Sequence, residues 1–148
     1  MLTIHHLDNS RSQRVIWLLE ELALDYQIVE HPHPKHNHKP SESLSKIHPL
    51  AKVPILTDDQ VILAETGAIF EYLLEQYGQN QLQPALQSPE RVNYHYWRHF
   101  SEASLMPYLA MKLLFVGMEA KTPWPFKLVI KLIAKAVAKV YLNPNIFL

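Results

Sequence analysis

The 148-residue sequence predicts an α/β fold in its first half that gives way to an all-α region. Over residues 1–77, short β-rich runs alternate with segments whose apolar residues recur at helical spacing. Residues 78–88, "GQNQLQPALQS", lose this periodicity and gain Gln and Pro, which is typical of a linker. From residue 89 onward the helical spacing returns, so we expect residues 89–148 to form a helical domain.

The first half begins with a strand, a helix and a second strand. "LTIHHL" at residues 2–7 has the length and apolar content of a short strand. Residues 14–24 repeat apolar side chains at helical spacing, and "DYQIVEH" at residues 25–31 again resembles a strand. "HPHPKHNHKP" at residues 31–40 is expected to be a polar loop, because each proline disfavours a helical conformation for its predecessor. A short helix over about residues 41–47 follows.

A hairpin and a further helix complete the first half. Residues 52–65 contain two brief β-rich runs around the turn residues 57–60. Residues 66–77 carry apolar and aromatic side chains on one helical face, and Gly78 is the predicted C-cap. The predicted element order is therefore βαβαββα.

The second half predicts long helices. Ser88 and Pro89 have the types favoured at an N-cap and a first helical position, so a helix is expected from there to about residue 117. Met106-Pro107 should bend or split it. Residues 123–142 predict another helix, whose circumference is apolar except for one solvent-facing stripe of four lysines. These are Lys127, Lys131, Lys135 and Lys139.

Composition excludes several classes of function. The formal net charge is zero and the pI is about 7.1, so we expect no nucleic-acid partner. Without cysteine, the chain can form no disulfide and no redox pair of its own. No apolar run reaches the length of a membrane span and no signal peptide pattern occurs, so we expect a cytoplasmic protein without membrane insertion.

Four stretches give this sequence its family resemblance. They are "SRSQR" after the first strand, "HPLAKVPIL", "LAETGAIFEYL" and "YWRHFSEASLMP". With them the chain resembles a glutathione S-transferase, with a thioredoxin-like N-terminal domain over residues 1–77 and part of the helical C-terminal domain over residues 89–148. The stretch "HHLDNSRSQRVIWLLEEL" is similar to the corresponding sequence of bacterial and fungal members in particular. Members are usually longer, and further helices would follow "NPNIFL".

The resemblance implies that Glu65 and Thr66 hold the γ-glutamyl end of glutathione. Glu65 can pair with the ammonium group. The Thr66 hydroxyl and the N–H groups of a helix start suit the carboxylate, although family members more often carry serine at this position. Taken without the family, an acidic residue beside a helix N-terminus has an ordinary structural explanation.

Val53 and Pro54 are implied to bind the central cysteine of glutathione. In this fold the proline is cis, and the backbone of the preceding residue pairs with the peptide in a strand-like manner. An ordinary trans proline at an edge strand is the alternative. Lys39 and Lys52 are the candidates for the glycine carboxylate, and solvated loop lysines are their alternative reading.

Ser10 is the candidate catalytic residue. Its interval to Arg14 matches that of the serine and arginine in theta-like and delta-like members, so its hydroxyl is implied to donate to the glutathione sulfur. Arg11 or a helix-start N–H is the second contributor, since cations and helix N-termini favour thiolates. Asn9 and Ser12 are competing donors, and Ser10 has the alternative of a simple helix N-cap.

The resemblance implies a detoxifying enzyme that activates glutathione, its co-substrate, for attack on a small electrophile or a peroxide. The alternative is a non-catalytic module that binds glutathione or partner proteins. A homodimer is expected, in which the N-terminal domain of one subunit meets the helical domain of the other. No metal is expected, because His31, His33, His36 and His38 alternate with prolines in a loop without fixed geometry.

One further expectation concerns the lysine-striped helix. Its apolar side chains cover more of the circumference than two neighbouring helices hide. We therefore expect an exposed apolar patch above the roughly few hundred Å² typical of monomers, and self-association that covers it.

Overall fold

A computed structural model describes residues 1–32 and 42–146. The chain divides into two compact units, Met1–Ser88 and Pro89–Leu148. Residues 78–88, the predicted linker, contain no helix or strand and fall within the first unit.

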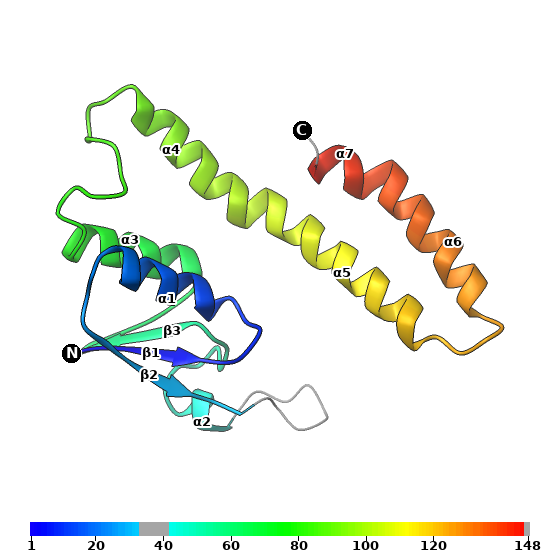
Figure 1. Cartoon of the computed structure of the whole chain (residues 1–148), viewed down its shortest axis with the longest axis horizontal. Helices are drawn as coiled ribbons and strands as arrows, with labels where there is room; N and C mark the ends of the chain where they lie inside the picture. Colours follow the sequence, from blue (N-terminus) through cyan, green and yellow to red (C-terminus); the bar gives the residue numbers. More distant parts are fainter. Residues whose placement is uncertain (33–41, 147–148) are drawn as a thin grey trace. The chain divides into compact units, whose positions relative to one another are not determined.

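The first unit has the predicted βαβαββα order (Figure 1). Its elements are β1 (Leu2–His6), α1 (Ser12–Glu21), β2 (Tyr26–Glu30), α2 (Glu42–Ser45), β3 (Ile55–Asp58), β4 (Val61–Ala64) and α3 (Thr66–Gln76). The strands form one mixed sheet in the order β2-β1-β3-β4. β1 is parallel to β2 and antiparallel to β3, which forms the predicted hairpin with β4. This is the thioredoxin-like arrangement.

Alternation along the strands separates the two faces of the sheet. Ile4 pairs with Leu56, and both are fully buried. On the opposite face, Ile55 and Ala64 form a cluster with Leu44 of α2. Helices α1 and α3 pack against each other, and Figure 1 shows them together on one side of the sheet. The fully buried Val15, Leu19, Ile69 and Leu73 make up most of their contribution to the core.

Helix α1 begins two residues before the predicted start and ends at Glu21. Its end is a Schellman motif, because the N–H of Ala23 donates to Glu20 and the N–H of Leu24 donates to Leu19. Ala23 has a φ of 50° there, a conformation in which glycine is usual. The prediction overran because an alanine carries no such signal in the sequence.

Gly78 does not cap α3 as predicted. Tyr77 is the C-cap, and no glycine in the described part of the chain has a positive φ. A Cβ at position 78 would lie 2.5 Å from the carbonyl oxygen of Leu74. Glycine is therefore required for the close approach of two backbone segments, rather than for a left-handed turn.

The helical unit contains α4 (Glu90–His99), a π-helix η1 (Phe100–Leu105) and α5 (Met106–Lys121), followed by α6 (Lys127–Val137), a π-helix η2 (Ala138–Leu142) and α7 (Asn143–Ile146). The predicted interruption near Pro107 is present, since the regular α-helical hydrogen bonding gives way to π geometry just before it. The N-cap of α4 is Pro89 and not Ser88. The lysine-striped helix begins at Lys127, after a cis Trp124-Pro125 bond that the sequence did not indicate.

Helix α6 leaves much of its apolar surface uncovered. Leu128, Val129, Leu132 and Ile133 are all exposed, and Leu132 retains 59% of its accessible area. The predicted exposed apolar face is thus present in the described part of the helical unit. No helix within residues 1–32 and 42–146 is both long and apolar enough to cross a membrane.

Candidate functional site

Three segments that are distant in sequence meet at one end of the sheet. The register pairs His5 near the end of β1 with Ile55 at the start of β3, and Ile55 with Ala64 at the end of β4. The turn after β1, the residues before β3 and the start of α3 therefore gather at this end. These segments carry Ser10, the Val53-Pro54 pair and the Glu65-Thr66 pair. The fold therefore brings the principal predicted site residues to the same end of the sheet.

Ser10 is half-buried in the turn before α1. Its Oγ lies 2.6 Å from Oγ of Ser12 and accepts a hydrogen bond from the Ser12 backbone N–H at 3.3 Å. The N-cap of α1 is Arg11, which uses no side-chain capping bond. Ser10 is therefore not the N-cap, although its hydroxyl does engage a helix-start N–H.

The competing donors are distinguished by exposure. Ser12 is fully buried, and its Oγ lies 2.8 Å from Nδ1 of His6. Asn9 is exposed and has a φ of 53°. Arg11 is half-buried beside Ser10. Of the two serines, only Ser10 has surface with which to meet a ligand.

Glu65 has an unusual backbone conformation between β4 and α3. Its φ of 73° and ψ of 123° lie in a region that favours glycine, and its side chain is exposed. Strained non-glycine residues of this kind cluster at ligand-binding positions. The next residue, Thr66, is 4% exposed, and its hydroxyl has no hydrogen-bond partner among the described residues. A buried hydroxyl in this state is one that a ligand atom or a water would satisfy.

The Val53-Pro54 bond is cis, as the family resemblance implied. Pro54 is buried directly before β3, Val53 is half-buried and Lys52 is exposed. Lys39 lies outside the described residues.

A polar pocket of about 360 Å³ adjoins the Ser10 turn. It is lined by His6, Asp8, Glu30, His31 and Pro32. On the other face of β1, Nδ1 of His5 lies 3.0 Å from Nε2 of His31, whose Nδ1 lies 2.8 Å from the hydroxyl of Ser43. Burial lowers the pKa of both histidines, and for His5 the neighbouring His31 adds to the effect.

Within residues 1–32 and 42–146, no group of three or more His, Asp or Glu side chains is arranged to hold a metal ion. His33, His36 and His38 of the histidine-rich loop lie outside the described residues.

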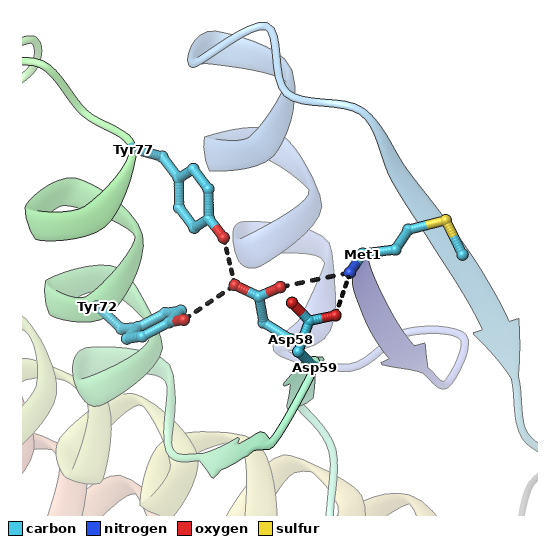
Figure 2. A network of polar contacts seen from close by, with 5 residues as sticks. All are labelled: Met1, Asp58, Asp59, Tyr72 and Tyr77. Atoms are coloured by element: carbon cyan, nitrogen blue, oxygen red, sulfur yellow. Dashed lines mark hydrogen bonds and ion pairs between the residues drawn. The ribbon is translucent and has the colours of Figure 1, made fainter.

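A second polar network lies at the opposite end of the sheet (Figure 2). The buried carboxylate of Asp58 accepts hydrogen bonds from the hydroxyls of Tyr77 and Tyr72, the latter at 2.9 Å. The N-terminal amine lies 3.6 Å from the same carboxylate and 2.9 Å from that of Asp59. The bond from Tyr77 is the main cause that lowers the pKa of Asp58, and it raises the pKa of Tyr77. The register pairs Asp58 with Leu2, so this network is remote from Ser10.

Comparison with protein families matches residues 4–81 to a model described as "Glutathione S-transferase, N-terminal domain". The chain is 36% identical over 149 residues to a Schizosaccharomyces pombe protein named glutathione S-transferase 3, covering all of this chain and 60% of that protein. It is 30% identical to a Saccharomyces cerevisiae protein named glutathione S-transferase 1, covering 95% of this chain and 63% of that one. The chain therefore spans about 60% of the length of these relatives.

Solved structures show the same fold. A glutathione S-transferase from Actinobacillus pleuropneumoniae matches 94% of this chain and 63% of its own, with a TM-score of 0.66 and 31% identity. A theta-class enzyme from Xanthomonas axonopodis, solved with glutathione bound, matches 93% of this chain and 67% of its own, with a TM-score of 0.65 and 23% identity.

Proposed function

This chain belongs to the glutathione S-transferase family, and we propose that it binds glutathione and activates its thiolate for transfer to a small electrophile or for reduction of a peroxide. The observation that carries the proposal is the meeting of Ser10, cis-Pro54 and the strained Glu65 at one end of the sheet. Each belongs to a motif that the resemblance assigns to a different part of glutathione. Their meeting supports a single site with a place for each part.

Glutathione is held along this end of the sheet. Glu65 pairs with the γ-glutamyl ammonium, and the Thr66 hydroxyl with the first N–H groups of α3 receives the carboxylate. The backbone of Val53, set by cis-Pro54, pairs with the cysteine of glutathione as one strand pairs with another. Lys52 holds the glycine carboxylate, together with Lys39.

Ser10 acts on the sulfur. A thiolate is the attacking species, and a hydroxyl that donates to it favours the ionised form. Lowering the thiol pKa by one unit requires roughly 1.4 kcal/mol, which one hydrogen bond to a charged group can supply. Arg11 and the N-terminus of α1 add positive potential beside the sulfur. The thiolate then attacks a carbon centre in conjugation or an oxygen centre in peroxide reduction.

The protein acts as a homodimer in the cytoplasm in this proposal. The exposed apolar face of α6 supports association with a further protein surface.

Turnover of glutathione with a generic aryl halide tests the proposal. Ser10→Ala should lower turnover about tenfold or more while leaving glutathione affinity nearly unchanged, because the hydroxyl acts on the thiolate and not on the rest of the ligand. Ser45→Ala is the matched control, since this exposed hydroxyl donates only to the nearby carbonyl of Glu42 among the described contacts.

Two outcomes would contradict the proposal. Glutathione binding without any turnover in the unaltered protein would identify the non-catalytic binding module instead. Full turnover in Ser10→Ala, with a loss of thermal stability alone, would reduce Ser10 to a structural residue of the turn.

A further inference from the structure

His6 lies behind the proposed catalytic serine and has no role in the chemistry described so far. It is the last residue of β1, and it is 9% exposed. Its Nδ1 is 2.8 Å from Oγ of Ser12, which is 2.6 Å from Oγ of Ser10. Its Nε2 is 3.6 Å from the carboxylate of Asp8. Four side chains thus form one row, from Asp8 through His6 and Ser12 to Ser10.

The hydroxyl of the buried Ser12 has two acceptors in this row, Nδ1 of His6 and Oγ of Ser10, so two arrangements of the hydrogens satisfy it. Each serine hydroxyl has a single hydrogen to donate, and a neutral imidazole has one donor and one acceptor nitrogen. If Nδ1 of His6 accepts, Ser12 donates to His6 and Ser10 must donate to Ser12. If Nδ1 carries a hydrogen, His6 donates to Ser12, Ser12 donates to Ser10, and the Ser10 hydroxyl is left to donate outward. The state of His6 therefore decides whether Ser10 has a hydrogen for a ligand.

We infer that His6 receives the proton of the glutathione thiol through Ser10 and Ser12. The thiol hydrogen passes to Oγ of Ser10, the Ser10 hydrogen passes to Oγ of Ser12, and the Ser12 hydrogen passes to Nδ1 of His6. One proton leaves sulfur and one arrives on the imidazole, so charge and atoms balance as thiolate and imidazolium. The same transfer reverses the direction of each hydrogen bond in the row. Ser10 then donates its hydrogen to the thiolate.

The surroundings of His6 suit the imidazolium. Asp8 faces Nε2, and Glu30 from the end of β2 lines the same pocket of about 360 Å³. His31 also lines this pocket, and it would oppose a charge on His6 if it were itself protonated. Burial lowers the pKa of His31, which favours its neutral form. Ser12, which links His6 to Ser10, is fully buried and therefore inaccessible to solvent. His6 acts through two hydroxyls and does not touch the sulfur, so it is a positioning residue.

This inference rests on the proposed role of Ser10, so its test must separate the two. The thiolate of bound glutathione absorbs in the ultraviolet, and titrating this absorbance with pH gives the pKa of the bound thiol. His6→Gln keeps a polar side chain that cannot take up a proton. It should raise the thiol pKa by about one unit, a tenfold loss of thiolate at fixed pH, with little change in glutathione affinity.

Two further variants control this titration. Ser12→Ala breaks the row at its centre and should give the same shift, and the double variant should be no worse than either single one, since both act through one chain. His5→Gln is the matched control. His5 has nearly the same burial on the same strand, but it faces the other side of the sheet and should leave the thiol pKa unchanged.

The number of protons released when glutathione binds provides a second measurement. It should not change if His6 has only a structural role. Calorimetry of glutathione binding in buffers of different ionisation enthalpy gives the number of protons released to solvent. If His6 takes up the thiol proton, the unaltered protein should retain this proton on binding glutathione and release almost none. His6→Gln should release protons in proportion to the thiolate that it still forms.

The outcomes distinguish a failure of the inference about His6 from a failure of the proposed role of Ser10. If Ser10→Ala raises the thiol pKa while His6→Gln and Ser12→Ala leave both pKa and proton count unchanged, the row is wrong and the role of Ser10 stands. If Ser10→Ala also leaves the thiol pKa unchanged, the proposed role of Ser10 fails, and this inference fails with it.

Discussion

The two units of the chain hide their apolar side chains to very different degrees. Among the described residues, every fully or nearly fully buried hydrophobic side chain except Leu142 lies in Met1–Ser88. In the helical unit, α4 and α6 bury no residue, and large apolar side chains such as Leu132 and Val140 are exposed. The first unit is thus stabilised by its own core. The second leaves many large apolar side chains exposed among its described residues.

The difference bears on function because the candidate site lies in the first unit. A serine and a histidine that must hold hydrogen bonds of 2.6 and 2.8 Å need a rigid frame. The fully buried residues of β1, α1 and α3 supply that frame. The helices of the second unit instead leave apolar side chains exposed.

The largest predicted effect compares one leucine from each unit. Leu56→Ala should destabilise the first unit by about 2–5 kcal/mol, because the side chain is fully buried and its removal leaves a cavity. Leu132→Ala should change the stability of the helical unit by less than about 0.5 kcal/mol, since that side chain is largely exposed. Hydrogen exchange, followed separately over each unit, measures both. Equal losses would mean that α6 is covered.

A smaller effect is expected at the polar network that closes the far end of the sheet. Asp58→Asn should cost about 1.5–3 kcal/mol, because two tyrosine hydroxyls lose a charged acceptor. The exposed Asp59 is the control, and Asp59→Asn should have little effect on stability.

This network also gives a pH dependence of known sign. Since folding lowers the pKa of Asp58, its contribution is fully present above the unfolded-state value near 3.8 and is lost as the pH falls through the folded-state value. Denaturant unfolding from pH 7 to pH 2 should show this acid loss in the unaltered protein and a weaker one in Asp58→Asn. An identical acid loss in both proteins would contradict the role of this carboxylate.

The smallest effect concerns association through α6. Replacing both Val129 and Leu132 by Gln should reduce binding of the dye ANS and lower the mass measured by light scattering, because the exposed apolar surface shrinks. Lys131→Gln alters the lysine stripe of the same helix and is expected to leave both measurements nearly unchanged. A monodisperse monomer that binds no dye would show that the apolar face is already covered within its own chain.

Local patterns in the sequence predicted the order of the elements well. Apolar side chains at helical spacing predicted the two longer helices of the first unit, and short apolar or β-rich runs predicted its strands, because both signals depend on a few consecutive residues. Ends were less predictable. The Schellman motif at Ala23 and the close contact at Gly78 depend on backbone geometry, and alanine or glycine alone does not specify it.

Contacts between elements were the main omission. Asp58 was interpreted as a turn residue, and its bonds to Tyr72 and Tyr77 depend on how α3 lies on the sheet. His6 and Ser12 are only six residues apart, but their contact requires both the register of β1 and the start of α1 at Ser12. The roles of Ser10, Arg11, Val53, Glu65 and Thr66 toward glutathione remain predictions, as do those of Lys52 and of Lys39, which lies outside the described residues.

The most direct test of the account is calorimetric titration of glutathione into the unaltered chain and into Glu65→Gln. We predict saturable binding to the unaltered chain and a loss of about 1.5–3 kcal/mol in the variant, because the neutral amide lacks the charge that pairs with the γ-glutamyl ammonium. Glu71→Gln, on the helix that follows Glu65, is the control and should bind as the unaltered chain does. Equal affinity of Glu65→Gln and the unaltered chain, or no binding to either, would contradict the glutathione site described above.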